Sequence, residues 1–280
     1  PPDWYFNREY MSFNYGSTDQ QRFPGRQHYN LRHEPIPAIP AKPQGFEEKY
    51  RAYVRGQIEE LLTRYGKIDV IWFDGGPEVI SIDEIRALQP GIVINPRMHG
   101  YGDFQTPECR MPDGPPEGWW ELCDIWPNGP WGYTKSHESY KPAGWMLAQL
   151  TKVRSWGGNL LINVGPRPTG ELPDVYYQRL GEVAAWMKHS GEAVFGVERG
   201  PYPERCNVPT TIRGRAWYLC TPPGFKDPVV ASSVSRPTSV RLLRTGQEVP
   251  YSFENGKLRV DIPDEARTDL VDVVAIGFAA

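Results

Sequence analysis

Four charged residues in the middle of the chain have the types and positions that acid–base chemistry needs. Asp74 directly follows a short apolar run, and Arg97 follows the next one in the tripeptide Asn-Pro-Arg. Glu108 and Glu121 come next, in a long stretch without periodicity. Cleavage of a glycosidic bond uses such a set, because one carboxylate attacks while a second one, kept protonated by its surroundings, supplies a proton. The simpler interpretation is a turn cap for Asp74 and solvated surface positions for the other three.

Two apolar runs predict a pair of strands with a helix between them. Residues 68–73 and 91–95 are short and rich in Ile and Val, which is typical of strands buried on both faces of a parallel sheet. Ser81 predicts the start of a short helix between them, with Glu84 three positions later as a capping box. Such a strand–helix–strand unit builds parallel sheets or barrels, and barrel active sites lie at the carboxyl ends of the strands.

Further helices are predicted on both sides of this unit. Residues 46–65 have apolar side chains three and four positions apart, the pattern of an amphipathic helix. After the irregular stretch 96–142, residues 143–155 and 174–189 predict two more helices. An apolar strand is predicted between these two helices, at 159–164. Because irregular stretches of such length inside a domain are usually functional, we expect the site to draw on 96–142.

The pattern changes after about residue 200. Short alternating segments recur at about ten-residue spacing, and Asn255-Gly256 between two of them predicts a hairpin. We therefore expect a small antiparallel β-sandwich over residues 200–280, after an α/β domain over residues 1–199. The alternating segments are 215–220, 239–243, 251–253, 257–261 and 271–278.

Composition narrows the classes of partner. The chain has 280 residues and a formal net charge of −3, with no long run of either sign, which argues against nucleic acid or an anionic membrane as the main partner. No apolar stretch approaches the ~18 residues of a membrane span. Ten Trp and fifteen Tyr supply flat rings that stack on sugar faces, although Trp also fills cores. The four cysteines and five histidines form no metal or redox motif, so we expect no metal and no cofactor, while the cysteine pairing stays open.

Six segments, in the same order along the chain, resemble the α-L-fucosidases of glycoside hydrolase family 29. They are 65–75 (YGKIDVIWFDG), 95–97 (NPR), 102–108 (GDFQTPE), 120–123 (WELC), 131–133 (WGY) and 157–166 (GGNLLINVGP). The resemblance covers residues 1–198 closely. It implies a TIM-type (β/α) barrel over 1–199 followed by the β-sandwich.

One departure from the family concerns the start of the barrel. The family's barrel begins with strands that carry a pair of adjacent histidines, which this sequence does not contain. Residues 1–5 resemble the segment just after one of those strands. Because a half barrel exposes unpaired strand edges, we expect a barrel that is incomplete at its N-terminal side. We also expect a companion N-terminal polypeptide to complete the working enzyme.

The resemblance implies catalytic roles for three carboxylates. Asp74 matches the family's nucleophile. Glu108 matches one placement of the general acid/base, which we favour over the alternative, Glu121. Family members retain the anomeric configuration, so the two catalytic carboxyl groups are expected about 5–5.5 Å apart.

The resemblance implies substrate contacts as well. Trp72, Arg97 and Trp131 match sugar-contacting positions, and Glu121 would be a further residue of the pocket. The two tryptophans would meet the apolar side and the C6 methyl of fucose. Arg97 would bind ring hydroxyls or steady the nucleophile.

The implied function is retaining hydrolysis of terminal α-L-fucosyl linkages on oligosaccharides or glycoconjugates by double displacement. The family's substrates favour a secreted, periplasmic or lysosome-like location, and a homo-oligomer is left open. Two alternatives remain. One is a related retaining barrel glycosidase that acts on a galactose-configured sugar, and the other is a catalytically silent, fucose-binding remnant.

Overall fold

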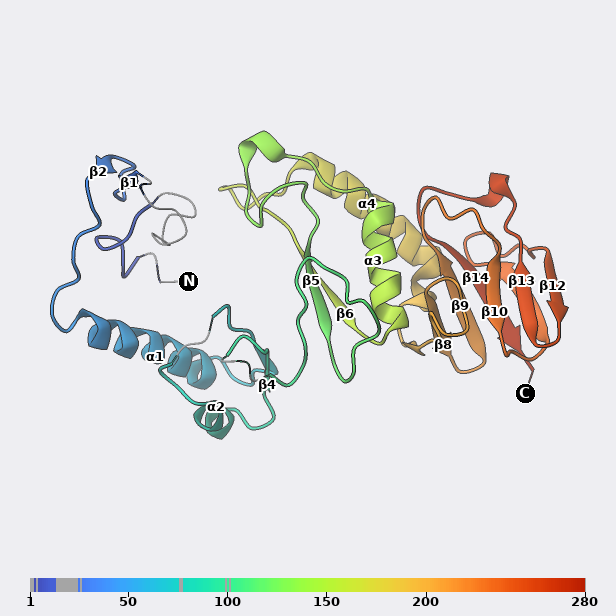
Figure 1. Ribbon diagram of the computed structural model, residues 1–280, viewed down its shortest axis with the longest axis horizontal. Coiled ribbons are helices and arrows are strands. Elements are labelled where there is room, and N and C mark those ends of the chain that lie inside the picture. The colour runs from blue at the N-terminus through green and yellow to red at the C-terminus, as the bar shows by residue number, and fades with distance from the viewer. Residues whose placement is uncertain are drawn as a thin grey trace. The chain divides into compact units, whose positions relative to one another are not determined.

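The computed structural model describes residues 3, 5–13, 25, 27–75, 78–98, 100 and 102–279. The chain divides into two units, Pro1–Asp103 and Phe104–Ala280, and Figure 1 labels their elements where there is room. Of residues 1–5 only Asp3 and Tyr5 are described, so most of the segment predicted to follow an early barrel strand lies outside the described residues.

Helix α1 (Phe46–Arg64) is the longest element of the first unit. Its apolar residues recur at three- and four-residue spacing, and Ile58 and Leu62 are buried. The helix ends where Gly66 adopts a φ of 84°, a conformation that glycine reaches without strain. The predicted helix is confirmed.

The predicted strand–helix–strand unit is also confirmed. Strand β3 (Val70–Ile71) and strand β4 (Val93–Ile94) pair in parallel, with Val70 opposite Val93. Helix α2 (Ile82–Leu88) connects them and begins at Ser81, which forms a complete capping box with Glu84. Both strands pack on α1 and α2 through a core that includes Leu62, Ile85 and Ile94.

Burial of the first strand differs from the prediction. Val70 is 51% exposed, so β3 is not buried on both faces. The reason is that successive side chains point to opposite faces: Ile71 packs into the core with α1 and α2, whereas Val70 belongs to no core cluster of the described residues.

The amino-terminal part of the first unit packs against α1. Phe6 stacks on Tyr53 with ring centroids 4.9 Å apart, and Phe46 meets Phe6 edge-on at 5.3 Å. Strands β1 (His28–Tyr29) and β2 (Pro35–Ile36) form a short antiparallel pair. This packing of aromatic rings covers one end of α1.

A second parallel pair opens the second unit. Strand β5 (Glu121–Ile125) pairs with β6 (Asn159–Asn163), and α3 (Ala143–Ser155) connects them. Helix α4 (Asp174–Ser190) follows, so the helices and the strand predicted after residue 143 are confirmed. Short 3-10 helices lie at Lys135–His137, Gly191–Ala193 and Asp264–Ala266.

The C-terminal part is an antiparallel β-sandwich, as predicted. One sheet has the order β11-β14-β9-β8-β7 and the other the order β10-β13-β12. A core of Val, Leu and Ile side chains from both sheets fills the space between them. Asn255 and Gly256 form the β12–β13 turn with positive φ at both residues. The strand bounds are β7 Glu198–Arg199, β8 Thr210–Arg213, β9 Ala216–Thr221, β10 Val229–Ser232, β11 Pro237–Leu242, β12 Tyr251–Glu254, β13 Lys257–Val260 and β14 Asp272–Phe278. Of these strands, β7, β8 and β10 were not predicted.

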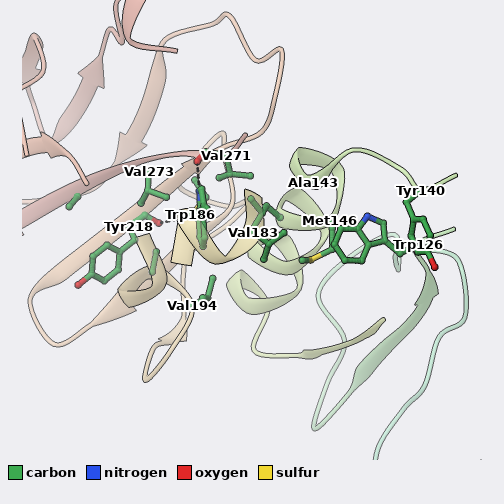
Figure 2. Packing of buried hydrophobic residues seen from close by; sticks show 14 residues of the cluster. Trp126, Tyr140, Ala143, Met146, Val183, Trp186, Val194, Tyr218, Val271 and Val273 are labelled. Carbon is green, nitrogen blue, oxygen red and sulfur yellow. Dashed lines mark hydrogen bonds between the residues drawn. The ribbon is translucent and has the colours of Figure 1, made fainter. Parts of the chain in front are cut away.

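A continuous core joins α3 and α4 to the five-stranded sheet (Figure 2). Trp186 of α4 is 1% exposed, and its indole N–H donates to the carbonyl of Val271 at 2.6 Å. Met146 of α3 and Val273 of β14 belong to the same cluster. The predicted boundary after residue 199 falls inside this unit and stays a prediction.

Within the described ranges the parallel strands form the pairs β3–β4 and β5–β6 and do not close into a barrel. No described helix is long and apolar enough to cross a membrane. Among the described residues the four cysteines form no disulfide bond, and three of them are buried.

Candidate active site

Asp74 lies in the bend that follows β3, at the carboxyl end of that strand. Its Oδ1 is 3.1 Å from Nη1 of Arg97. The side chain of Asp74 is 67% exposed, whereas that of Arg97 is 26% exposed. The carboxylate is therefore held on one side by an arginine and is open to solvent on the other.

The Asn-Pro-Arg segment after β4 contacts three consecutive residues at the end of β3. The guanidinium of Arg97 lies 4.9 Å from the ring centroid of Trp72, in cation–π geometry. The side-chain amide of Asn95 bonds to Phe73 twice, accepting from its N–H at 2.7 Å and donating to its carbonyl at 2.8 Å. With the Arg97–Asp74 ion pair, residues 72, 73 and 74 are each contacted by the segment that follows β4.

Sequence reasoning selected Arg97 from this segment and missed Asn95. The structure buries Asn95 completely, at 0% exposure. A signal for it was present, since a polar amide at the end of an apolar strand must find hydrogen-bond partners when it is buried. The sequence could not show which backbone groups the Asn95 amide bonds, because Phe73 lies 22 positions earlier and is brought close only when β3 pairs with β4.

A hollow of about 780 Å³ lies between α1 and the carboxyl end of β3. Tyr50, Trp72, Asp74 and Glu78 are among the residues that line it. The indole Nε1 of Trp72 is buried and has no hydrogen-bond partner within the described residues. Tyr50, Trp72 and carboxylate side chains thus meet at one concave surface, which combines aromatic rings with polar groups as small-molecule sites do.

The structure corrects the predicted setting of Glu121. It is the first residue of strand β5, not part of a loop. Its backbone N–H donates to the carbonyl of Gln105 at 2.8 Å, and its strand pairs with β6 on the other edge. The sequence concealed this strand because Glu121 and Asp124 interrupt the apolar run.

Glu108 and Glu121 lie on the same face of the second unit. Residues 105–108 run parallel to β5, with Glu108 opposite Cys123. Because paired residues share a face and side chains alternate along a strand, Glu108, Cys123 and Glu121 project to one side. Leu122, between the last two, packs against Val153 of α3 on the other side.

Electrostatics and position favour different glutamates as proton donor. Burial raises the pKa of Glu121, which keeps a proton available nearer neutral pH. Glu108 is exposed and lies further toward the carboxyl end of β5, the end at which barrel active sites lie. The choice between them stays a prediction.

Trp131 lies exposed in the segment that follows β5. Two residues later, the hydroxyl of Tyr133 donates to Glu138 at 2.6 Å. Arg167, in the turn after β6, donates to both carboxylate oxygens of Glu138, at 3.1 and 3.0 Å. These bonds to Arg167 and Tyr133 lower the pKa of Glu138 to about 2. They tie the segment that carries Trp131 to the loop that follows β6.

The predicted residues are thus distributed over both units. The first unit brings together Trp72, Asp74 and Arg97. The second unit places Glu108 and Glu121 on one face and holds Trp131 in a segment beyond β5.

Comparison with known proteins identifies the class to which this fold and these residues belong. The family model described as Alpha-L-fucosidase matches residues 4–192. The chain belongs to the alpha-L-fucosidase family. It is 29% identical over 175 residues to the tissue alpha-L-fucosidase of Bos taurus, a match that covers 55% of this chain and 37% of the relative. It is 36% identical over 160 residues to the plasma alpha-L-fucosidase of Rattus norvegicus, covering 50% of this chain and 34% of that one.

Solved structures share the fold. Alpha-L-fucosidase isoenzyme 1 from Paenibacillus thiaminolyticus superposes with a TM-score of 0.73 at 29% identity, covering 85% of this chain and 64% of that one. A family 29 alpha-L-fucosidase from Bacteroides thetaiotaomicron, in a trapped covalent intermediate, gives a TM-score of 0.69 at 21% identity, covering 85% and 64%. The chain therefore spans about a third of the length of these curated relatives and under two thirds of these solved chains.

Proposed function

We propose that this chain carries catalytic residues of a retaining α-L-fucosidase, with Asp74 as nucleophile. The observation that supports this most directly is the carboxylate at the end of β3, exposed and paired with Arg97. Arg97 bonds to Oδ1, which leaves Oδ2 as the oxygen that attacks the anomeric carbon. Family membership supplies the substrate class, a fucosylated oligosaccharide or glycoconjugate.

The proposed reaction has two steps. Oδ2 of Asp74 bonds to the anomeric carbon as the glycosidic C–O bond breaks, and Glu108 gives its proton to the leaving oxygen. The ionised Glu108 then takes a proton from water, whose oxygen displaces Asp74 and releases fucose with its configuration retained. Glu121, whose pKa is raised by burial, is the alternative proton donor. We further propose that Trp72 and Trp131 contact the apolar face and the methyl group of the sugar.

The two parallel pairs are proposed to belong to a (β/α) barrel whose remaining strands lie outside them. The likeness to the Paenibacillus structure, which covers 64% of that chain, supports this arrangement. A companion polypeptide is one source of those strands. Native mass spectrometry of the species that hydrolyses fucosides tests it, and an active species that contains this chain alone would rule out the companion.

Covalent trapping tests the nucleophile. The protein is incubated with 2-fluoro-fucosyl fluoride and digested, and we expect the label on the peptide that contains Asp74. The relative from Bacteroides was trapped with the same reagent. A label on another peptide would show that a different residue attacks. No label and no turnover would favour a silent sugar-binding remnant, and faster cleavage of aryl galactosides than of aryl fucosides would favour the galactose-configured alternative.

Substitution of the nucleophile gives a second test. Asp74→Gly should lower kcat by about 10⁴-fold, and added azide should restore part of it by filling the vacated space. For the proton donor, Glu108→Gln is compared with Glu121→Gln on substrates with good leaving groups, which need no proton. The variant that recovers on such substrates identifies the donor.

A further inference from the structure

We propose that Asn95 is a positioning residue for Asp74, because its side chain extends the β3–β4 ladder beyond the last main-chain pair. This inference rests on the proposed function, since it assigns Asn95 a role through the proposed nucleophile. The sequence motif does not reveal this role of Asn95, because Arg97 in the same motif already accounts for a contact with Asp74.

The main-chain ladder stops just short of the nucleophile. Along β4 the N–H of Val93 donates to the carbonyl of Asp69 at 2.9 Å, and the N–H of Asn95 donates to that of Ile71 at 3.4 Å. The next donor in a parallel ladder would be the N–H of residue 97, aimed at the carbonyl of Phe73. The chain turns at Pro96 and Arg97 instead. The Nδ2 of Asn95 takes the place of that donor, at 2.8 Å from the Phe73 carbonyl.

The same amide also satisfies the other backbone group of Phe73. Its Oδ1 accepts from the Phe73 N–H at 2.7 Å, so both groups of the residue before Asp74 are bound by one side chain. Asn95 is fully buried, so these bonds are shielded from water and an unpaired amide there would be unfavourable. The geometry of the bend is thereby fixed at Phe73.

Fixing Phe73 also sets the relation of Asp74 to Arg97. Asp74 follows Phe73 directly, and Arg97 lies two residues after Asn95, so one amide joins both segments immediately before the charged pair. Attack on an anomeric carbon depends on placement to within a fraction of an ångström, and a displacement of about 1 Å costs about 10²-fold in rate. We expect the Asn95 amide to act on this placement and not on sugar binding.

The chain offers a control in Gln89, which lies just before β4 and bonds to backbone near the amino end of β3. Gln89 is also a side-chain amide that bonds to backbone, with Nε2 donating to the carbonyl of Leu62 at 2.6 Å and Oε1 accepting from the N–H of Ile68 at 3.3 Å. It fixes the amino end of β3, away from Asp74. With a further bond from Nε2 to the carbonyl of Gly66 at 2.9 Å, Gln89→Ala removes at least as many side-chain-to-backbone bonds at a half-buried position, without touching the bend.

The first experiment compares the two amides in the protein that is active on aryl fucosides. Asn95→Ala should lower kcat by about 10²-fold with little change in KM, whereas Gln89→Ala should leave kcat unchanged. Asn95→Leu keeps the branched shape of the side chain, adds no charge and removes both bonds to Phe73, so it should show a similar loss without leaving a cavity. Should Asn95→Ala fail to fold, Asn95→Leu decides. Unchanged kcat in the folded Asn95 variants, or an equal loss in Gln89→Ala, overturns the proposal.

The second experiment separates positioning from a general structural effect. In the Asp74→Gly background azide acts as the nucleophile, and it is not attached to the bend. Adding Asn95→Ala should then change the azide-rescued rate little. A loss as large as that in the unsubstituted protein would show a structural role only and overturn the proposal. Absence of any azide rescue or trapped ester at Asp74 in the protein without Asn95 substitutions would instead refute the proposed function, and this inference with it.

Discussion

Contacts with Trp72 and Asp74 restrict Arg97 from different sides. Its guanidinium lies over the ring of Trp72 at 4.9 Å and bonds to Asp74 at 3.1 Å. A planar, permanently charged group can stack and donate at the same time, which an ammonium group does less well. The two possibilities raised for this residue, binding of ring hydroxyls and support of the nucleophile, are therefore compatible, and the structure shows the contact with Asp74 directly.

We predict that Arg97→Lys lowers activity strongly and changes the free energy of unfolding little. Because Asp74 is 67% exposed, the ion pair should contribute no more than about 1 kcal/mol to the free energy of unfolding. The lysine keeps the charge but loses the stacked geometry, so kcat/KM should fall by about 10²-fold. Fucoside kinetics and thermal unfolding measure the two effects. A drop in Tm with unchanged kcat/KM would contradict this prediction.

The burial of Glu121 predicts that the free energy of unfolding depends on pH. Burial raises its pKa, so between the usual and the raised value the folded protein binds more protons than the unfolded one. The free energy of unfolding then falls as pH rises through that window. Glu121→Gln removes this fall. The free energy of unfolding of the variant, relative to that of the unsubstituted protein, should therefore increase from pH 4 to pH 7.

Urea unfolding at both pH values measures this difference. Glu117→Gln, on the exposed segment before β5, controls for the loss of one negative charge and should shift stability by less than about 0.5 kcal/mol. If Glu121→Gln gains as much stability at pH 4 as at pH 7, or more, ionisation of Glu121 does not destabilise the folded protein.

At the scale of elements, the loops beyond β5 and β6 are joined by one carboxylate. Glu138 accepts from Tyr133 in its own segment and from Arg167 across the gap to the next loop. Close packing reinforces the link, because a Cβ added at Gly165 would lie 3.1 Å from the backbone N of Tyr133. Trp131 is therefore presented by a segment that is held in place at both loops.

We predict that Arg167→Lys raises KM for fucosides with little change in kcat. Lysine cannot form the two parallel bonds to Glu138, so the segment that carries Trp131 should spend less time in its binding position. If that position is populated about a tenth of the time, KM rises about tenfold. Lys152→Arg, on α3, is a control for a charge-conserving change.

The pH profile of this effect has a definite sign. The pKa of Glu138 is lowered to about 2, so the bond to Arg167 is fully present above the usual carboxyl range and is lost only as pH falls through about 2. The ratio of KM values for variant and unsubstituted protein should be constant from pH 5 to pH 8. A ratio that varies in this range would mean that another group controls the loop.

At the scale of the whole chain, the second unit is held together by the core in Figure 2. Helix α4 contributes Trp186, whose indole bonds to the loop before β14 at Val271. Side chains of the helices and of the sandwich interlock here, so the parallel pair β5–β6 and the sandwich are not separated by a flexible linker. This core supports α3, the helix that covers one face of the strand bearing Glu121.

We predict that Trp186→Phe destabilises the second unit as a whole. Loss of the buried bond should lower the free energy of unfolding by about 1–3 kcal/mol, because the carbonyl of Val271 loses its partner. Trp119→Phe, at a position 75% exposed, should change it by less than about 0.5 kcal/mol. Urea unfolding followed by far-UV circular dichroism measures both variants. Separate transitions for helix and sheet signals in Trp186→Phe would contradict a shared core.

Local patterns in the sequence determined most elements. The spacing of apolar residues predicted α1 and α4, because a helix repeats its faces within a single segment. The Ser81–Glu84 capping box and the Asn255-Gly256 turn are likewise complete within a few residues. The order of short motifs sufficed to identify the family, since each motif is read along the chain.

The tertiary structure decided what depended on distant partners. Strand β5 was hidden because Glu121 and Asp124 break its apolar pattern, and only pairing with β6 and with residues 105–108 makes it a strand. The contact of Asn95 with Phe73 spans 22 positions, and no local preference encodes it. The sequence by itself determined which residue types stand at the strand ends. Only the folded chain decided which of them touch, because hydrogen-bond geometry is set by the approach of separate segments and not by the order of residues.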